Sequence, residues 1–389
     1  MQTTQCTLFA SLVLALLCTM PVGRVSADDD RHSIRTHHVN CDLPGHTLTK
    51  ALKRAQPGDT IRVQGTCKET VTITTDRLTL LGVHNATIQG PGGPPSLDVS
   101  EGILNIVGVQ GVEIRNLTIQ DSPVNGISGR QGAAFVVRDT RVHQSSGTGI
   151  EVTENSTVRF LGTCEVRGSS RAGISIRRGS SALLLADLVH TIHNNWGVLV
   201  LWNSSLALTG EQTTLLTEEN TTDGIIVADN SNLRLDGGLL TSQRNGSRGL
   251  ALGEGNSGIL GGTVLLAQNQ QGLTLNDASR MAVFMAGNLT IQHNTMAGLI
   301  ADNQSTLRII NGGTITDNGP QDVVLRLGSA ATLSGYTCRR RRPSYWPSIL
   351  LSTAAGPSSP QRHSNPLSGQ LSSRATRHVL TFSLLMPQR

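Results

Sequence analysis

Short apolar stretches alternate with polar turns along most of the chain, and they recur at a regular spacing. A glycine followed by alternating apolar residues occurs at Gly126, Gly149, Gly173, Gly197, Gly224, Gly249, Gly272 and Gly298. The intervals between these glycines are 23, 24, 24, 27, 25, 23 and 26 residues. An internal period of this length is typical of solenoid proteins, in which each repeat forms one structural unit.

Each period contains three apolar stretches, as residues 224–246 illustrate. Residues 224–227, 233–235 and 239–241 are largely apolar, and Asp, Asn, Ser and Gly fill the turns between them. Alternation with a period of two indicates β-strands that bury one face, and no stretch is long enough for a helix. The pattern therefore predicts an all-β solenoid, a single-stranded parallel β-helix of about eleven coils with three short strands per coil.

The start of the repeat region predicts a short N-terminal capping helix. Apolar residues lie at helical spacing between Thr47 and Ala55, and Thr47 is a suitable N-cap. Such a helix would cover the end of the apolar column, which would otherwise be an exposed strand edge. We expect a signal peptide over residues 1–27, an N-terminal segment over 28–46, the parallel β-helix over 47–335 and a tail over 336–389.

Both ends of the chain differ from the repeats in composition. Residues 8–22 are apolar over the length of a signal sequence and are short for a membrane span, and small residues precede Asp28. Residues 336–389 contain eight arginines but no Asp, Glu or Lys, which predicts a disordered basic tail. We expect a secreted, periplasmic or cell-surface protein with no membrane span after signal cleavage.

Charge and cysteine content narrow the function classes. Without the eight tail arginines and Arg24 of the signal, the net charge changes from +5 to −4, so no nucleic-acid partner is expected. Aromatic residues make up only 3% of the chain, which fits a narrow solenoid. Cys41 and Cys67 are candidates for a disulfide in an oxidising compartment, and no zinc-binding spacing is present.

The sequence resembles the pectate-lyase-like superfamily of right-handed parallel β-helix proteins. The resemblance lies in the stretch 48–63 (LTKALKRAQPGDTIRV), in 70–80, and in the later Asn…Gly-Ile-x-Val units, and it covers roughly residues 41–335. It implies a right-handed β-helix. It implies little about activity, because the superfamily contains lyases, hydrolases, epimerases, adhesins and proteins of unknown role.

The catalytic sequence elements of the β-helix enzymes are absent. The chain contains no Gly-His-Gly or Arg-Ile-Lys of the polygalacturonase-like hydrolases, no Asp-Pro-His-Asp of the alginate epimerases and no Arg-x-Pro-x-x-Arg of the pectate lyases. The residues therefore favour a non-catalytic protein that binds carbohydrate or has a surface or envelope structural role. Alternatives are a polysaccharide lyase or epimerase with an unrecognised site, and an adhesin-like spacer.

Two columns of residues follow the repeat. An asparagine ends each coil, three or four residues before the next repeat, and we interpret this column as a structural amide ladder. The second column lies five residues after each glycine, and we expect Asp302 to continue it. Its carboxylates could hold calcium, and its Arg and Trp could contact a polysaccharide or cell-surface glycan, although a solvated turn would look similar. The ladder comprises Asn194, Asn220, Asn245, Asn269, Asn294 and Asn318, and the candidate ligand-binding column comprises Glu154, Arg178, Trp202, Asp229, Glu254 and Asp277.

Overall fold

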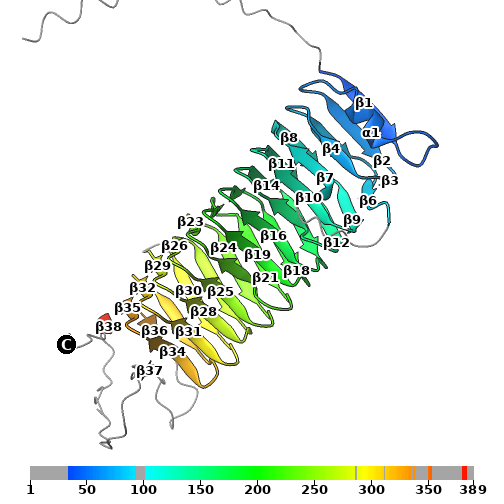
Figure 1. Ribbon diagram of the computed structural model, residues 1–389. Coiled ribbons are helices and arrows are strands. Elements are labelled where there is room, and N and C mark those ends of the chain that lie inside the picture. Colours follow the sequence, from blue (N-terminus) through cyan, green and yellow to red (C-terminus); the bar gives the residue numbers. More distant parts are fainter. Residues whose placement is uncertain are drawn as a thin grey trace, which may run out of the picture. The chain divides into compact units, whose positions relative to one another are not determined.

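The computed structural model is a parallel β-helix made of three sheets (Figure 1). It describes residues 34–92, 101–284, 287–310, 312–334, 336–337, 349–352 and 379–382. The chain divides into two units, Met1–Ile34 and Arg35–Arg389, and everything below concerns the second. The expected signal peptide and most of the expected tail lie outside the described residues.

From β2 onward every third strand joins the same sheet, so each coil passes once through sheet C, sheet A and sheet B. Sheet A contains β1 (Thr36–Asn40), β2 (Thr60–Gln64), β5 (Thr79–Gly82), β8 (Gln110–Arg115), β11 (Ala134–Arg138), β14 (Thr157–Leu161), β17 (Ser181–Leu184), β20 (Ser205–Leu208), β23 (Asn232–Leu235), β26 (Ser257–Leu260), β29 (Arg280–Val283), β32 (Thr306–Ile309), β35 (Ala330–Ser334) and β38 (Val379–Phe382). Sheet B contains β3 (Thr66–Lys68), β6 (Thr87–Gln89), β9 (Thr118–Ser122), β12 (Arg141–Ser145), β15 (Thr163–Arg167), β18 (Leu188–Ile192), β21 (Thr214–Glu218), β24 (Leu239–Gln243), β27 (Thr263–Ala267), β30 (Asn288–Gln292), β33 (Gly313–Thr316) and β36 (Tyr336–Thr337). Sheet C contains β4 (Val71–Ile73), β7 (Gly102–Val107), β10 (Asn125–Arg130), β13 (Ile150–Val152), β16 (Ala172–Arg177), β19 (Trp196–Leu201), β22 (Ile225–Val227), β25 (Arg248–Leu252), β28 (Gln271–Leu275), β31 (Ala297–Ala301), β34 (Gln321–Arg326) and β37 (Ile349–Ser352).

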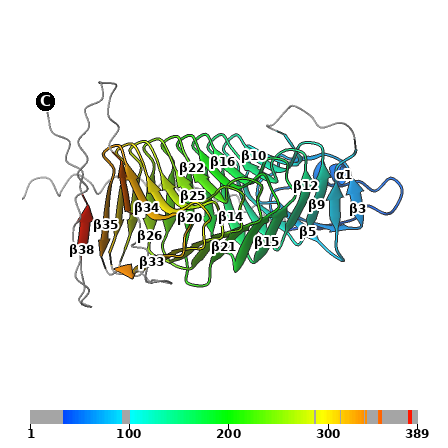
Figure 2. The ribbon, with the colours of Figure 1, turned by 90° about the horizontal axis from the view of Figure 1, so that it is seen from below.

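The coils stack in chain order, as Figure 2 shows from a second direction. The expected fold class is confirmed, although sheets B and C each contain 12 strands where about eleven coils were expected. Within the expected tail, β36 and β37 pair parallel with β33 and β34, and β38 pairs antiparallel with β35. Disorder of the remaining tail stays a prediction.

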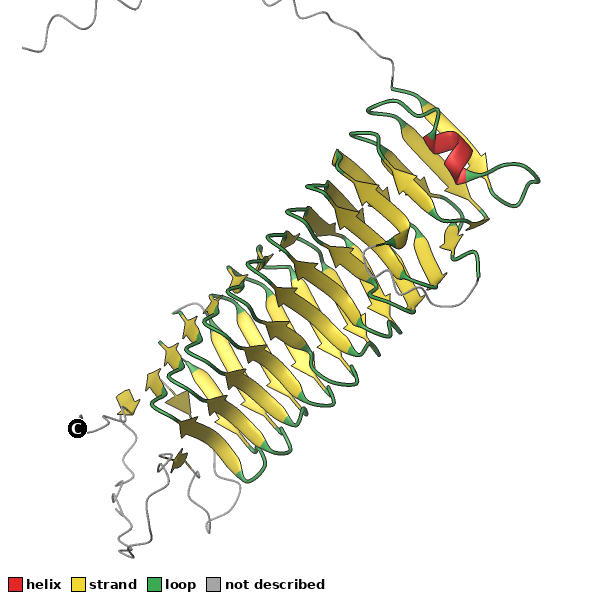
Figure 3. Ribbon diagram, in the orientation of Figure 1, coloured by secondary structure: helices red, strands yellow, loops and turns green. Residues whose placement is uncertain are grey.

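One short helix, α1 (Leu48–Leu52), covers the N-terminal end of the coils (Figure 3). Thr47 is its N-cap, as expected, and accepts a hydrogen bond from the backbone N of Lys50. The helix is shorter than expected because its last turn tightens, with the N–H of Arg54 bonding to the carbonyl of Ala51. Among the described residues no helix has the length and apolarity needed to cross a membrane. Ahead of α1, β1 already pairs with β2, so sheet A begins inside the segment 28–46.

Inward-facing apolar residues stack in rows from coil to coil. In sheet C, Ile225 pairs in register with Val198 on one side and Leu250 on the other. The complete row of this repeat position is at most 2% exposed, and it contains Ile150, Ile174, Val198, Ile225, Leu250, Leu273 and Leu299. Each coil therefore buries its core residues within the coil and against the coils before and after it.

The six asparagines form a continuous hydrogen-bonded ladder in the turn between sheets B and C. The side-chain Oδ1 of Asn220 accepts from the backbone N of Asn194 at 3.0 Å and from its Nδ2 at 3.2 Å. The same pattern repeats down to Asn318, whose Nδ2 donates to Oδ1 of Asp322 at 3.0 Å. Since the asparagines are at most 9% exposed, the ladder satisfies backbone groups that water does not reach.

The repeated glycine is required by this ladder. A Cβ atom on Gly249 would lie 2.7 Å from Nδ2 of Asn269 and 2.8 Å from the carbonyl oxygen of Gly272. Any larger residue would therefore push the next coil away. Asparagine and glycine recur together in the sequence because their positions touch across neighbouring coils.

A second polar ladder, in the turn between sheets C and A, was not predicted from the sequence. The Oγ atom of Ser180 accepts from the backbone N of Ser156 at 3.1 Å, and Oγ of Ser204 accepts from the N of Ser180 at 3.2 Å. The ladder is buried and consists of Ser156, Ser180, Ser204, Ser231, Asn256, Ser279, Ser305 and Ser329. Its sequence signal is a small polar residue seven positions after each repeat glycine from Gly149 to Gly298.

We predict that Ile225→Asp prevents folding, whereas Ile226→Asp does not. Ile225 is fully buried, and an unpaired carboxylate there costs several kcal/mol, whereas Ile226 points outward and is only half-buried. Circular dichroism and thermal melts of the two purified variants provide the comparison. A folded Ile225→Asp protein would contradict the inward assignment of this row.

We also predict that Asn245→Ala lowers the free energy of unfolding by at least about 2 kcal/mol. The change leaves the backbone N–H and the Nδ2 of Asn220 without their acceptor, and an unsatisfied buried donor costs roughly 1–3 kcal/mol. Asn232→Ala is the control, because Asn232 is exposed on sheet A and should change stability by less than about 0.5 kcal/mol. Urea unfolding measures both, and equal losses would refute the ladder's role.

Candidate functional site

The six residues proposed for ligand binding occupy one row on the turn between sheets C and A, here called the C–A row. All six have a left-handed backbone, with φ between 53° and 63°. The backbone N of Asn155 donates to the carbonyl of Arg178 at 3.0 Å, and the N of Gly179 donates to that of Trp202 at 2.9 Å. Backbone hydrogen bonds between neighbouring coils therefore hold the members of the row in register with one another.

The C–A row continues with Asn303, and the expectation of Asp302 was wrong. The backbone N of Ala278 donates to the carbonyl of Asn303 at 2.8 Å, while the N of Asp302 bonds back to Leu275 in the strand. The offset of five residues from the repeat glycine holds at this coil too, since Asn303 follows Gly298 by five. The Nδ2 of Asn303 donates to Oδ1 of Asp277 at 2.7 Å.

Trp202 lies beside two arginines at the centre of this row. Its side chain is 41% exposed, a large fraction for tryptophan. The guanidinium carbons of Arg177 and Arg178 lie 5.8 Å and 5.6 Å from the ring centroid, within the range of cation–π attraction. Arg178 also lies 3.9 Å from Glu154. The row thus presents an aromatic ring next to a cationic group on an open surface.

Trp196 does not add to this aromatic surface. It begins β19, whereas Trp202 follows the end of the same strand. Six residues of extended chain separate them, or about 20 Å at roughly 3.3 Å per residue. A ligand at Trp202 would reach Trp196 only by crossing the outer face of sheet C, past the half-buried Leu199 and Leu201.

Beyond Trp202 the C–A row becomes acidic. A hydrogen bond with Asp229 and its negative charge raise the pKa of Glu254, and burial and Asp277 add smaller increases. Glu254 and Asp229 are hydrogen-bonded to each other, but the three carboxylates follow one another along the row and do not all converge on one point. In the described part of the chain, the one group of three potential ligand side chains with converging atoms is Cys41, Cys67 and Glu69, whose sulfurs are joined in a disulfide. The row is therefore no preformed cage for calcium, which would have to bridge neighbouring coils.

A buried Glu151–Arg177 pair beside the C–A row was missed by the sequence analysis. Glu151 is the outward residue of β13, yet it is only 1% exposed, and its carboxylate accepts a hydrogen bond from Nε of Arg177. Burial raises the pKa of Glu151 to about 7, although Arg177 opposes the shift. The signal was a charged residue at a position that other coils fill with Ser, Leu, Ile, Ala or Thr.

A second unpredicted cluster lies on sheet B and the turn that follows it. His190 contacts Glu218 at 3.0 Å and His193 contacts Glu219 at 2.9 Å, while Arg244 bonds to both glutamates. The hydrogen bond from Arg244 is the main cause that lowers the pKa of Glu219. Arg244 forms ion pairs with both glutamates and the two histidines are hydrogen-bond partners, so the cluster has the character of a surface network of ion pairs and hydrogen bonds.

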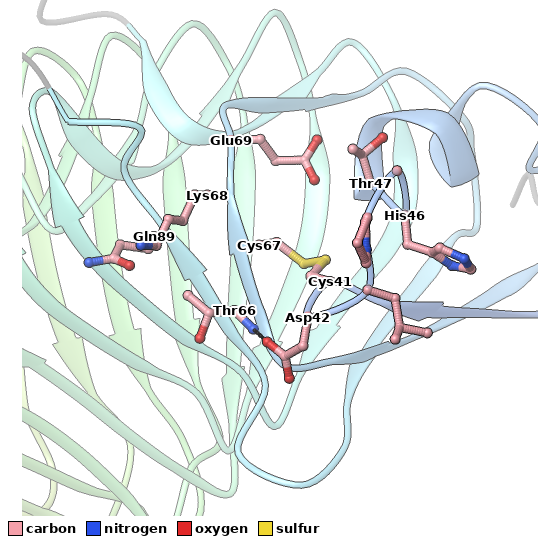
Figure 4. Close-up of a pocket in the computed structure, with 12 residues that line it drawn as sticks. Cys41, Asp42, His46, Thr47, Thr66, Cys67, Lys68, Glu69 and Gln89 are labelled. Carbon is pink, nitrogen blue, oxygen red and sulfur yellow. Dashed lines mark hydrogen bonds between the residues drawn. A yellow bond between two sulfur atoms is a disulfide. The ribbon is translucent and has the colours of Figure 1, made fainter.

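A hollow of about 700 Å³ opens at the N-terminal end, with the Cys41–Cys67 disulfide at its wall (Figure 4). Asp42 and Glu69 lie on opposite sides of it in this view, but both carboxylates are engaged. Asp42 accepts from the backbone N of Thr66 at 3.0 Å, and Glu69 accepts from the backbone of α1. The hollow therefore has carboxylates that serve the backbone and no reactive pair.

Comparison with known proteins identifies the fold. A family model described as "Right handed beta helix region" matches residues 101–205. The chain is a right-handed parallel β-helix. The A-module of the Azotobacter vinelandii mannuronan C-5 epimerase AlgE6 superposes with a TM-score of 0.50 at 13% identity, over 76% of this chain and 94% of that one. The corresponding AlgE4 module has a TM-score of 0.46 at 13% identity, over 78% and 93%. No curated protein sequence matches the chain.

These matches confirm the resemblance to the pectate-lyase-like superfamily at the level of the fold. Structural neighbours of the β-helix include polysaccharide epimerases, lyases and hydrolases. At such low identity the likeness concerns the fold alone and transfers no active-site residue to this chain.

We predict that the contribution of Glu151 to the stability of the protein falls as the pH rises from about 5 to 8. The pKa of Glu151 is raised to about 7 in the folded state, so folding favours the protonated carboxyl, and this stabilisation is lost as the pH passes from the unfolded value through 7. In Glu151→Gln this part of the pH dependence should disappear. Urea unfolding of both proteins at pH 5 and pH 8 measures it, and identical pH slopes would contradict the assignment.

Proposed function

We propose that the protein is a secreted, non-catalytic β-helix that binds polysaccharide at the C–A row around Trp202. The main support is the exposed Trp202 ring beside Arg177 and Arg178. Aromatic rings bind the apolar face of a sugar, and a guanidinium suits a carboxylate or another anionic group. The acidic part of the row offers hydroxyl acceptors and oxygen ligands for a bridging calcium ion.

Secretion is part of this proposal. It rests on the signal-like residues 1–27 and on the Cys41–Cys67 disulfide, a bond typical of extracellular and periplasmic proteins. The structural neighbours named as polysaccharide enzymes make a carbohydrate partner a reasonable first choice for the β-helix surface.

A polysaccharide lyase or epimerase is the second candidate, and Glu151 is the observation that favours it. A carboxyl group with a pKa of about 7 beside an arginine has the properties of a general acid–base pair. Its 1% exposure opposes this role, because a substrate would have to reach a covered carboxyl. In the binding protein Glu151 instead fixes Arg177 next to Trp202.

A glycan array followed by a product assay separates the candidates. The array is run with calcium and with a chelator, and each bound glycan is then incubated with the protein and examined for unsaturated products by ultraviolet absorbance and for epimerised sugars by proton NMR. Binding without product supports the proposal, and product formation that Glu151→Gln abolishes supports the enzyme. Absence of any glycan binding favours an adhesin-like spacer.

We predict that Trp202→Ala weakens binding of an array-positive glycan at least tenfold and leaves the melting temperature nearly unchanged. The residue is exposed, so its removal costs the sugar contact and little packing, and tryptophan is enriched among the few binding residues whose truncation costs about 2 kcal/mol or more. Leu327→Ala is the control, because Leu327 is an apolar residue with 40% exposure in the same turn position at the far end. If Trp202→Ala unfolds the protein, Trp202 is a packing residue.

A further inference from the structure

A second hollow, here called the basic hollow, lies at the N-terminal end of the coils on the other side of loop 43–47. Its volume is about 570 Å³. None of its lining residues is acidic, whereas Lys50, Arg54 and three histidines contribute to its wall. The histidines are His37, His38 and His46. His46 and Thr47 border both hollows, and Figure 4 shows where they lie in the wall of the first.

Asp59 and Glu69, two carboxylates at this end, are used by backbone N–H groups and by His37, and neither of them pairs with Lys50 or Arg54. Asp59 accepts from the backbone N of Arg35 and of Gln56, each at 2.9 Å, and from His37 at 2.8 Å. Glu69 accepts from the N of Leu48 at 2.7 Å and from Thr49. The N-terminal N–H groups of α1 are therefore already satisfied, and they take no part in a ligand site.

Several arginines of the coils have a carboxylate partner that Lys50 and Arg54 lack among the described residues. In the coils, Arg138, Arg177, Arg244 and Arg248 each contact a carboxylate. Within the described ranges no carboxylate pairs with Lys50 or Arg54. The Nζ of Lys50 is held at the rim of the basic hollow by a 2.9 Å bond to the carbonyl of Gly45. Two cations thus face one concave surface without a counter-charge from the protein.

We propose that the basic hollow binds an anionic sugar, one that carries a sulfate, phosphate or carboxylate group. Lys50 and Arg54 provide the charge for the anionic group, and Thr47 with the exposed His38 and His46 provides hydrogen-bonding groups for hydroxyls. The hollow has room for a sugar ring, because its volume of about 570 Å³ is many times the roughly 30 Å³ that one water molecule occupies. This site goes beyond the proposed function, because it lies on α1 and β1 and not on the C–A row.

The test uses the full-length mature protein carrying Trp202→Ala, so that the C–A row cannot supply the signal. The probes are a sulfated tetrasaccharide, a phosphorylated oligosaccharide, an oligogalacturonide, a neutral oligosaccharide of equal length and inorganic sulfate, titrated calorimetrically at 150 mM salt to suppress unspecific attraction. Lys50→Gln is compared with Lys53→Gln. Lys53 is exposed, lies at the C-cap of the same helix and does not line the hollow. Each variant removes one positive charge, so Lys53→Gln controls for the change in net charge.

We expect at least one anionic sugar to bind, with a Kd at least fivefold weaker in Lys50→Gln and in Arg54→Gln, and changed less than twofold in Lys53→Gln. Which probe binds identifies the anionic group. The proposal is overturned if no anionic sugar binds, if Lys53→Gln weakens binding as much as Lys50→Gln, or if inorganic sulfate or the neutral sugar binds equally well. The failure of glycan binding at Trp202 would leave this result unaffected, because the ring is absent throughout.

Discussion

The fold depends on one requirement, which is that each buried turn must find partners for its backbone hydrogen-bonding groups. Pairing within sheets A, B and C provides partners for the backbone N–H and C=O groups of the strands. The turn between sheets B and C is also buried, and water does not reach its backbone groups. The asparagine ladder provides those partners, and each amide touches the glycine of a neighbouring coil. The repeat is therefore as much a polar as an apolar pattern, and the asparagine column requires glycine at the position that it contacts.

The ladder also explains why the sequence predicts this fold so well. Equivalent residues stack directly over one another, so a side chain that fits one coil fits the next, and the pattern is reinforced about every 25 residues. The inward row through Ile225, the asparagine ladder and the offset of five residues to the C–A row could all be counted along the chain. The error at Asp302 arose from taking the last repeat to be slightly shorter, whereas the constant offset of five residues points to Asn303.

The candidate sites were less predictable, because function resides in departures from the repeat. The Glu151–Arg177 pair is not repeated at equivalent positions of the other coils. The pairing could not be predicted from the sequence, because the sequence does not show that Glu151 is buried. The basic hollow is visible only in three dimensions. Its charge depends on Asp59 and Glu69 bonding to backbone N–H groups and to His37 and not to Lys50 or Arg54. Counting charges along a chain cannot distinguish a carboxylate that neutralises a cation from one that caps a backbone.

Two buried carboxyl groups show that burial alone does not fix a protonation state. Burial raises the pKa of both Asp59 and Glu151. At Asp59, hydrogen bonds from Gln56, His37 and Arg35 outweigh it and lower the pKa to about 2, whereas at Glu151 burial prevails and the pKa is about 7. Asp59 therefore stays charged and ties β1 to the turn after α1 at any ordinary pH. Glu151 changes charge near neutrality, next to the guanidinium groups that flank Trp202. Consequently the N-terminal end is held by a fixed charge, while the proposed sugar-binding surface borders a charge that pH can alter.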